Sequence, residues 1–452
     1  MSQYVDVKDL EEKTAKVVET AMSKGASTAV ADIHQKTEFD VEVRNGEIEQ
    51  LSEAESFGIF LTVSKNGRRA SVSSCDLSPE SIESLVDHGL ALCRYTDQDP
   101  FYKLPERDWL CWDTQELDMF DERLLSISIE EKIQKVRELE AALRGQDPRL
   151  KSDGCSLSTI VAASAFANSL GFCRSETSGM IATGIAAFAE DEVKDGDLNV
   201  GRKQTGYWSA RARHIEDLDG PEYVARLAAK QVLRKLGARK PKTGRYPIYF
   251  EPKMAKTLWS HLLKAISGSA IFRNESYLVD RLGTQVCAPS INMTDHPRLP
   301  RGLRSRCFDN DGVASLPLKI VEGGELKTYI MNTYSASKLN SRSTGHAGGT
   351  TNILIDPGPY SEDEMIKSMG TGVWITSMLG EGANISTGDF SRGALGLWVE
   401  DGVPVYPIME FTLNSHLDEM LKNISMLGNN VYKNDSTQTP GLVIGEMTIS
   451  GS

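Results

Sequence analysis

A segment rich in Lys, Arg, Gly and Pro lies at residues 237–247, GARKPKTGRYP. The sequence patterns that indicate secondary structure differ before and after it. Before it, helix-type and strand-type spacings of apolar residues alternate, whereas glycine-punctuated hairpin patterns dominate after it. Glycine and proline are the strongest local breakers of regular structure, so this segment is expected to be a linker. A chain of 452 residues also exceeds what one hydrophobic core usually serves. The sequence therefore predicts more than one domain.

The part before the linker carries one order of predicted elements twice. A first helix has an apolar stripe that runs from Leu10 to Met22, and hairpins and a second helix that begins after Ser78 follow it. The two hairpins turn at Asn-Gly pairs, Asn45-Gly46 and Asn66-Gly67. From about residue 128 to 237 the order helix, strands, helix returns, and Ser128 with Glu131 forms a capping-box signature at its start. This recurrence predicts a possible internal repeat.

The part after the linker is predicted to be rich in β-structure. Hairpins are indicated at Gly323-Gly324 and Asp401-Gly402. Two helices are expected as exceptions, over residues 252–267 and in HLDEMLKNISML, residues 416–427. The predicted fold class is α+β, with an N-terminal half of curved sheets with flanking helices and a β-rich C-terminal domain. The predicted domain ranges are 1–115, 116–237 and 238–452.

Composition narrows the functional classes. A formal net charge of −13 and a pI near 5.2 argue against direct binding of nucleic acid, which needs a basic surface. The chain has no run of eighteen apolar residues, and its N-terminal stretch is charged from the sixth residue onward. We therefore expect a cytoplasmic protein with neither a membrane span nor a secretory signal.

The sequence contains no local catalytic motif of a familiar kind. The closest pair of histidines, His261 and His296, is 35 positions apart, and the HExxH pattern of zinc proteases is absent. A GxSxG elbow and a phosphate-binding loop are absent as well. Spacing alone therefore favours a structural role for His261, which lies in the apolar stretch WSHLLKAISG.

One polar loop has the composition of a binding loop. The stretch SRSTGHAGGTTN, residues 341–352, combines glycines, hydroxyl side chains and a histidine. Its backbone N–H groups could hold a peptide carbonyl or a carboxylate, and a plain polar turn is the alternative. The candidate peptide-binding residues are His346, Gly348, Gly349 and Asn352.

Four stretches together resemble the TldD/PmbA family, in particular its PmbA (TldE) branch. These stretches are GRRASVSSCDLSPESIESLV, TYSASKLNSRSTGHAGGTTN, MGTGVWITSMLGEGANISTGDFSRGALGLWVEDGVPVYP and MLKNISMLGNN. The resemblance covers nearly the whole chain. It implies a heterodimer in which a TldD-type subunit is a zinc peptidase and the PmbA-type subunit is its partner. It also implies a link to microcin maturation, antitoxin degradation and the older description "modulator of DNA gyrase".

The zinc motif implied by this resemblance is not kept in the chain. In the TldD branch an HExxxH helix and a later cysteine bind zinc, and these positions fall on Ser260, His261, Ala265 and Thr439. The first ligand position is serine, the base position is His261, and the remaining ligand positions hold alanine and threonine. Zinc hydrolysis needs ligands for the ion and a base for the attacking water. We therefore expect no catalytic residue and no metal in this chain, with zinc held by the partner subunit.

Two other functions stay open at this point. The chain could be an active metallopeptidase with dispersed ligands such as His261, His296 and His346, or a peptide-binding regulator linked to gyrase inhibitors without proteolysis. A homodimer is possible when the partner is absent. On the helix itself, the apolar stripe from Met254 to Ile266 is expected to face the core, with His261 off that stripe.

Overall fold

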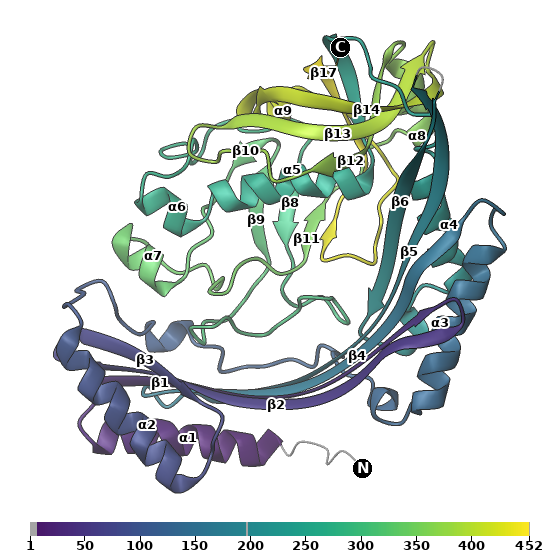
Figure 1. Cartoon of the computed structure of the whole chain (residues 1–452). Coiled ribbons are helices and arrows are strands. Elements are labelled where there is room, and N and C mark those ends of the chain that lie inside the picture. The colour runs from purple at the N-terminus through teal and green to yellow at the C-terminus, as the bar shows by residue number, and fades with distance from the viewer. Residues whose placement is uncertain (1–6, 196–197, 452) are drawn as a thin grey trace.

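The N-terminal half is built on one long, strongly curved antiparallel sheet (Figure 1). The computed structural model of the protein describes residues 7–195 and 198–451. Six strands follow the order β3-β2-β1-β4-β5-β6. Their bounds are β1 (Thr28–Arg44), β2 (Glu47–Lys65), β3 (Arg68–Ser74), β4 (Lys151–Asn168), β5 (Cys173–Asp195) and β6 (Leu198–Ala212). The predicted Asn-Gly turns join β1 to β2 and β2 to β3, with positive φ at both Asn45 and Asn66.

Helices cover the convex face of this sheet in two pairs (Figure 1). They are α1 (Val7–Ser23), α2 (Pro79–Leu92), α3 (Ile129–Arg144) and α4 (Pro221–Leu233). Strand residues alternate, so that Ile33 and Ile59 are buried under the first pair and Val41 under the second. The prediction for Met22 is wrong: its side chain is 37% exposed, because the buried stripe of α1 ends at Ala21.

The order helix, three strands, helix occurs twice, as α1-β1-β2-β3-α2 and α3-β4-β5-β6-α4. The first strand of each set lies at the centre of the sheet, where β1 and β4 pair from Val30–Asn168 to Val43–Cys155. One sheet therefore runs through both predicted N-terminal ranges, 1–115 and 116–237, whose boundaries stay predictions. Short 3₁₀ turns occupy Cys93–Tyr95, Arg107–Trp109, Glu122–Leu125 and Ile215–Asp217.

The C-terminal part lies on the concave side of the curved sheet (Figure 1). Its larger sheet has the order β14-β13-β12-β7-β17-β15, and an additional pairing of β14 with β17 curls it back on itself. A second sheet has the order β10-β9-β8-β11-β16. The strand bounds are β7 (Gly244–Phe250), β8 (Met293–Asp295), β9 (Leu318–Glu322), β10 (Glu325–Leu326), β11 (Ile353–Ile355), β12 (Gly372–Leu379), β13 (Asp389–Glu400), β14 (Val403–His416), β15 (Ile424–Leu427), β16 (Thr437–Gln438) and β17 (Leu442–Ser450). The predicted α+β class with a strand-rich C-terminal part is confirmed.

Helices fill the space between the two C-terminal sheets and around them. They are α5 (Pro252–Ala265), α6 (Gly268–Phe272), α7 (Thr333–Lys338), α8 (Glu362–Ser368) and α9 (Leu417–Lys422). The predicted helix over residues 416–427 is wrong in its second half. It ends at Lys422, and Ile424–Leu427 forms β15, because this apolar segment finds a ladder partner in β17. No helix within residues 7–195 and 198–451 is both long and apolar enough to cross a bilayer.

Candidate functional site

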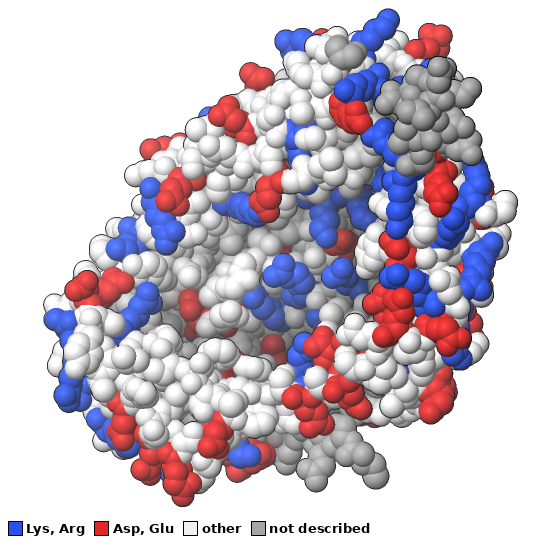
Figure 2. Space-filling model, in the orientation of Figure 1, with Lys and Arg blue, Asp and Glu red and all other residues white. Residues whose placement is uncertain are grey.

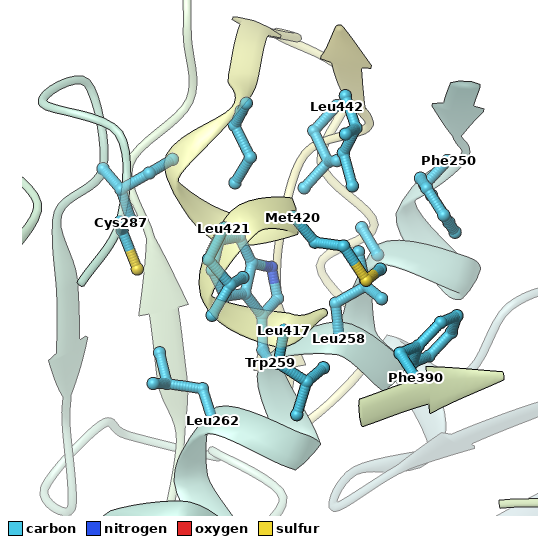
Figure 3. Close-up of a cluster of buried hydrophobic side chains, with 14 of the residues drawn as sticks. Phe250, Leu258, Trp259, Leu262, Cys287, Phe390, Leu417, Met420, Leu421 and Leu442 are labelled. Carbon is cyan, nitrogen blue, oxygen red and sulfur yellow. The ribbon is translucent and has the colours of Figure 1, made fainter. Parts of the chain in front are cut away.

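Helix α5 is held in the main core of the C-terminal part. Pro252 stands at its first turn, where a missing N–H is tolerated, and only Glu251 separates it from β7. Leu258 and Trp259 lie against Leu417 and Met420 of α9 (Figure 3). These four side chains are at most 1% exposed, so the position of the helix is set by packing.

His261 is buried on this helix. Its side chain is 4% exposed, and its ring meets the edge of Phe390 on β13 at a centroid distance of 6.2 Å. Its Nε2 has no hydrogen-bond partner among the described residues. Burial lowers the pKa of His261, and the nearby charges of Arg392 and Lys264 lower it further. His261 lies off the stripe of Leu258 and Leu262 but is buried, because β13 covers the side of the helix that carries it.

The neighbouring motif positions offer few donors. Ser260 is half-buried, and its hydroxyl donates to the carbonyl of Thr257 at 2.7 Å within the same helix. Ala265 is fully buried and has no side-chain donor or acceptor. Of the three motif positions on α5, His261 alone carries a nitrogen that a metal could use.

Thr439 lies beside α5, although it is far away in the sequence. The indole Nε1 of Trp259 donates to its hydroxyl at 2.8 Å, and that hydroxyl donates to the carbonyl of Pro440 at 3.0 Å. An ion pair of 2.6 Å between Lys256 and Asp435 attaches the same segment to the helix. Trp259 was not among the sequence-predicted site residues. A buried indole N–H that needs an acceptor is the signal that points to it.

These residues do not fit a zinc ion. Structural and catalytic zinc sites use three or four Cys, His, Asp or Glu ligands. The hydroxyl of Thr439 is already engaged by Trp259, and Ala265 contributes no ligand atom. In residues 7–195 and 198–451, no three side chains of these ligand types come together as a possible metal site.

In the loop at residues 341–352, His346 has a structural environment. Its side chain is fully buried; Nδ1 contacts the carbonyl of Thr344 at 2.6 Å, and Nε2 contacts Oδ2 of Asp295 at 3.1 Å. Thr351 donates to the same carboxylate from its backbone N–H at 2.8 Å and from its hydroxyl. The carboxylate of Asp295 thus attaches His346 and Thr351 of the loop to β8. Of the three histidines considered as dispersed metal ligands, His346 contacts Asp295 and His296 follows Asp295 in the chain. His261 packs instead on Phe390 of β13.

The other three candidate loop residues divide into one buried and two exposed positions. Asn352 is buried and donates to the carbonyl of His296 at 2.9 Å and to the hydroxyl of Ser305 at 2.8 Å. Gly348 and Gly349 are exposed, with φ of 86° and 94°. Both values lie in the region that glycine adopts without strain. Peptide binding by this loop stays a prediction, with its exposed surface at the two glycines.

The loop and the Thr439 segment lie side by side. β11, which directly follows Asn352, pairs in parallel with β16, and Ile353 is opposite Thr437. The structure therefore brings two sequence-predicted groups to neighbouring strands. The nearby hollow between the curved sheet and the C-terminal part contains several Lys and Arg side chains (Figure 2).

The chain is similar to known proteins over nearly its full length. Three family models match in succession: PmbA/TldA metallopeptidase domain 1 over residues 29–93, the central domain over 122–236 and the C-terminal domain over 243–451. The protein named Metalloprotease PmbA from Escherichia coli O157:H7 is 33% identical over 445 residues, which cover 98% of this chain and 96% of that protein.

Solved structures share the same architecture. A Bacteroides thetaiotaomicron protein described as a modulator of DNA gyrase superposes with a TM-score of 0.92 at 25% identity, over 99% of this chain and 100% of that one. TldE from Thermococcus kodakarensis superposes with a TM-score of 0.84 at 19% identity, over 97% and 100% of the two chains. The chain therefore belongs to the PmbA/TldD metallopeptidase family, as its sequence resemblance predicts.

Proposed function

We propose that this chain is the PmbA/TldE-type, non-catalytic subunit of a two-chain metallopeptidase. A TldD-type partner holds the zinc and cleaves the peptide, and this chain completes the complex. The observation that carries the proposal is the side-chain set on and beside α5. Ser260, Ala265 and Thr439 replace metal ligands with a serine, an alanine and a threonine whose hydroxyls are bonded internally.

The packing of α5 supports the proposal that the helix has a structural role in this subunit. Leu258, Trp259 and Leu262 fix it in the core, and His261 is enclosed by Phe390. A buried neutral imidazole without a carboxylate partner is a poor base for a water molecule in an open cleft. The proposed contribution of this chain is therefore binding surface.

The substrates we propose are unfolded or modified peptides, as in microcin maturation and antitoxin degradation. Figure 2 shows a wide hollow on the concave side of the curved sheet, with Lys and Arg side chains along part of its wall. Extended chains without a fixed fold suit such a wide polar surface better than a folded domain does. A role in relation to DNA gyrase would act through such peptides, because the chain has a net charge of −13.

Reconstitution tests the proposal. This chain and a TldD-type subunit from the same genome are purified separately, and zinc-dependent cleavage of an unfolded peptide is measured for each alone and for the mixture. We expect cleavage in the mixture only, and coelution of the two chains in size-exclusion chromatography. Chelator-sensitive cleavage by this chain alone would instead support the metallopeptidase with dispersed ligands.

Two further outcomes are decisive. Metal analysis of this chain purified alone is expected to find far less than one zinc per chain, and one tightly bound zinc would contradict the proposal. If the TldD-type subunit cleaves equally well without this chain, the proposed contribution to the complex is wrong.

A further inference from the structure

A polar cavity of about 580 Å³ lies where three parts of the chain meet, away from α5. It is lined by the connector at residues 114–122, by β4 and the stretch of β5 at residues 175–178 that pairs with β4 but not with β6, and by residues 305–307 of the C-terminal part. Its lining includes the hydroxyl-bearing residues Ser164, Ser178 and Ser305, together with Arg213, Arg306 and Glu176. Such a lining suits a charged or polar ligand.

Arg213 brings a positive charge to this cavity without a counter-ion. Its guanidinium donates to the carbonyl of Gly179 at 2.9 Å and to the carbonyl of Leu303. Its buried Nε has no acceptor among the described residues. Burial lowers the pKa of Arg213 to about 10, so the group is still charged at neutral pH and bears the cost of desolvation.

Arg306 repeats this arrangement in the same cavity. It donates to the carbonyl of the exposed Gly349 at 2.6 Å, and its buried Nε also has no acceptor among the described residues. Of the side chains that the structure describes, none supplies a carboxylate within 4.0 Å of either guanidinium. Buried Arg234, in contrast, is paired with Glu251 at 2.8 Å. Arg213 and Arg306 are half-buried, and charges that are partly removed from water are normally paired, so these two guanidinium groups in one cavity are suited to hold an anion.

The carboxylate of Glu176 is not the anion that pairs with these arginines. One of its carboxylate oxygens accepts from the backbone N–H of Cys307 at 3.5 Å, and burial raises its pKa to about 7. Near neutral pH a large share of Glu176 is therefore protonated and able to donate a hydrogen bond. The cavity lining then has two cations and one proton donor, together with the carboxylates of the exposed residues Glu116 and Glu122.

We propose that this cavity binds a carboxylate group, held by Arg213 and Arg306. Guanidinium groups match carboxylate geometry, and charge-assisted hydrogen bonds are the strong ones. That the carboxylate belongs to a peptide rests on the proposed function. It would be either the C-terminal carboxylate of the peptide or an Asp or Glu side chain, which share this chemistry.

Calorimetric titration of the full chain alone tests this proposal and needs no protease activity, so a failed reconstitution leaves it untouched. The probes are an acetylated Gly/Ser pentapeptide with a free C-terminal carboxylate, its C-terminal amide, and an amidated version with one central glutamate. We expect the free-carboxylate or the glutamate peptide to bind, which identifies the source, and the neutral amide to bind at least about tenfold more weakly.

Variants then assign the binding to the two arginines. Arg306→Gln is expected to weaken binding at least about tenfold, and Arg213→Gln to do the same if it folds. Arg226→Gln, on the exposed face of α4, removes the same charge elsewhere and should leave binding unchanged. Glu176→Gln should bind at least as tightly as the unmodified chain.

Four results would overturn the proposal. They are equal binding of the neutral amide, equal weakening by Arg226→Gln, weaker binding by Glu176→Gln, and binding of inorganic phosphate without binding of any peptide.

Discussion

At the scale of the residue, His261 is expected to make stability depend on pH. Its pKa is lowered by burial, so the unfolded chain takes up its proton more readily than the folded chain does. The stability it contributes is present above the ordinary pKa of histidine, 6.5, and is lost as the pH falls below it. Between about pH 7.5 and 5.5, the melting temperature of His261→Leu should therefore fall less than that of the unmodified chain. The same substitution at exposed His88 is the control, and an equal effect there would contradict this explanation.

Glu176 is expected to act in the opposite direction. Its pKa is raised from 4.5 to about 7, so its protonated form is favoured in the folded chain. Its contribution is complete below pH 4.5 and is lost as the pH rises to about 7. Glu176→Gln should therefore gain on the order of 1–3 kcal/mol relative to the unmodified chain between pH 5 and 8, measured by urea unfolding. Glu55→Gln, at an exposed position on β2, should show no such gain, and a flat difference for Glu176→Gln would refute the prediction.

Residue roles were predictable where they depend on close sequence neighbours. The capping box of Ser128 and Glu131 is present as predicted, because both partners lie in one helical turn. The burial of His261 depends on Phe390, and the bond of Trp259 depends on Thr439. Both partners are distant in the sequence, and apolar spacing in one helix carries no information about them.

At the scale of the element, α5 depends on the segment that carries Thr439. Thr439→Val removes the acceptor of the buried Trp259 Nε1 while keeping the shape of the side chain. An unsatisfied buried donor costs about 1–3 kcal/mol, so the free energy of unfolding should fall by that amount. Thr62→Val, which removes a hydroxyl pair with Ser71 on the exposed side of the sheet, is the matched control. If both variants lower the free energy of unfolding by the same amount, the hydrogen bond of Trp259 contributes no more than an exposed hydroxyl pair.

Elements with their own turn signals were the most predictable. The hairpins at Asn45-Gly46 and Asp401-Gly402 follow from residues that accept positive φ. Residues 424–427 have no such local signal: ISML suits a helix or a strand, and pairing with β17 decides between them. The candidate loop was predictable as a turn from its glycines, but the burial of His346 against Asp295 was not.

At the scale of the whole molecule, the fold depends on pairing between distant segments. β1 and β4 join two sets of elements into one sheet, and the sequence predicts the sets without predicting their junction. The curvature of this sheet lets the C-terminal part lie on its concave side (Figure 1). The linker prediction at residues 237–247 is wrong for its last four residues, because residues 244–247 begin β7, which pairs with β17. The chain crosses from one part to the other over residues 237–243, and the sequence does not predict how the parts are held together.

A buried ion pair fastens the two parts at that crossing. Arg234, at the end of α4, pairs with Glu251, at the start of α5, and their side chains are 8% and 11% exposed. Arg234 also donates to the carbonyl of Thr376 at 3.1 Å, and Trp374 donates to Glu251 at 3.2 Å. Removing one partner of a buried pair leaves an uncompensated charge, so Arg234→Met should lower the free energy of unfolding by about 3–5 kcal/mol.

A second variant distinguishes the cost of the unpaired charge from the cost of the lost packing. Arg234→Met combined with Glu251→Gln removes the stranded charge but keeps an acceptor for Trp374, so it should recover a clear part of the loss in urea unfolding. Arg245→Met, which breaks an exposed pair with Glu446, should cost less than about 1 kcal/mol. The two parts should also separate more readily in Arg234→Met, which limited proteolysis within residues 237–243 would detect. If Arg234→Met costs no more than Arg245→Met, packing of the curved sheet on the C-terminal part holds the molecule together without this ion pair.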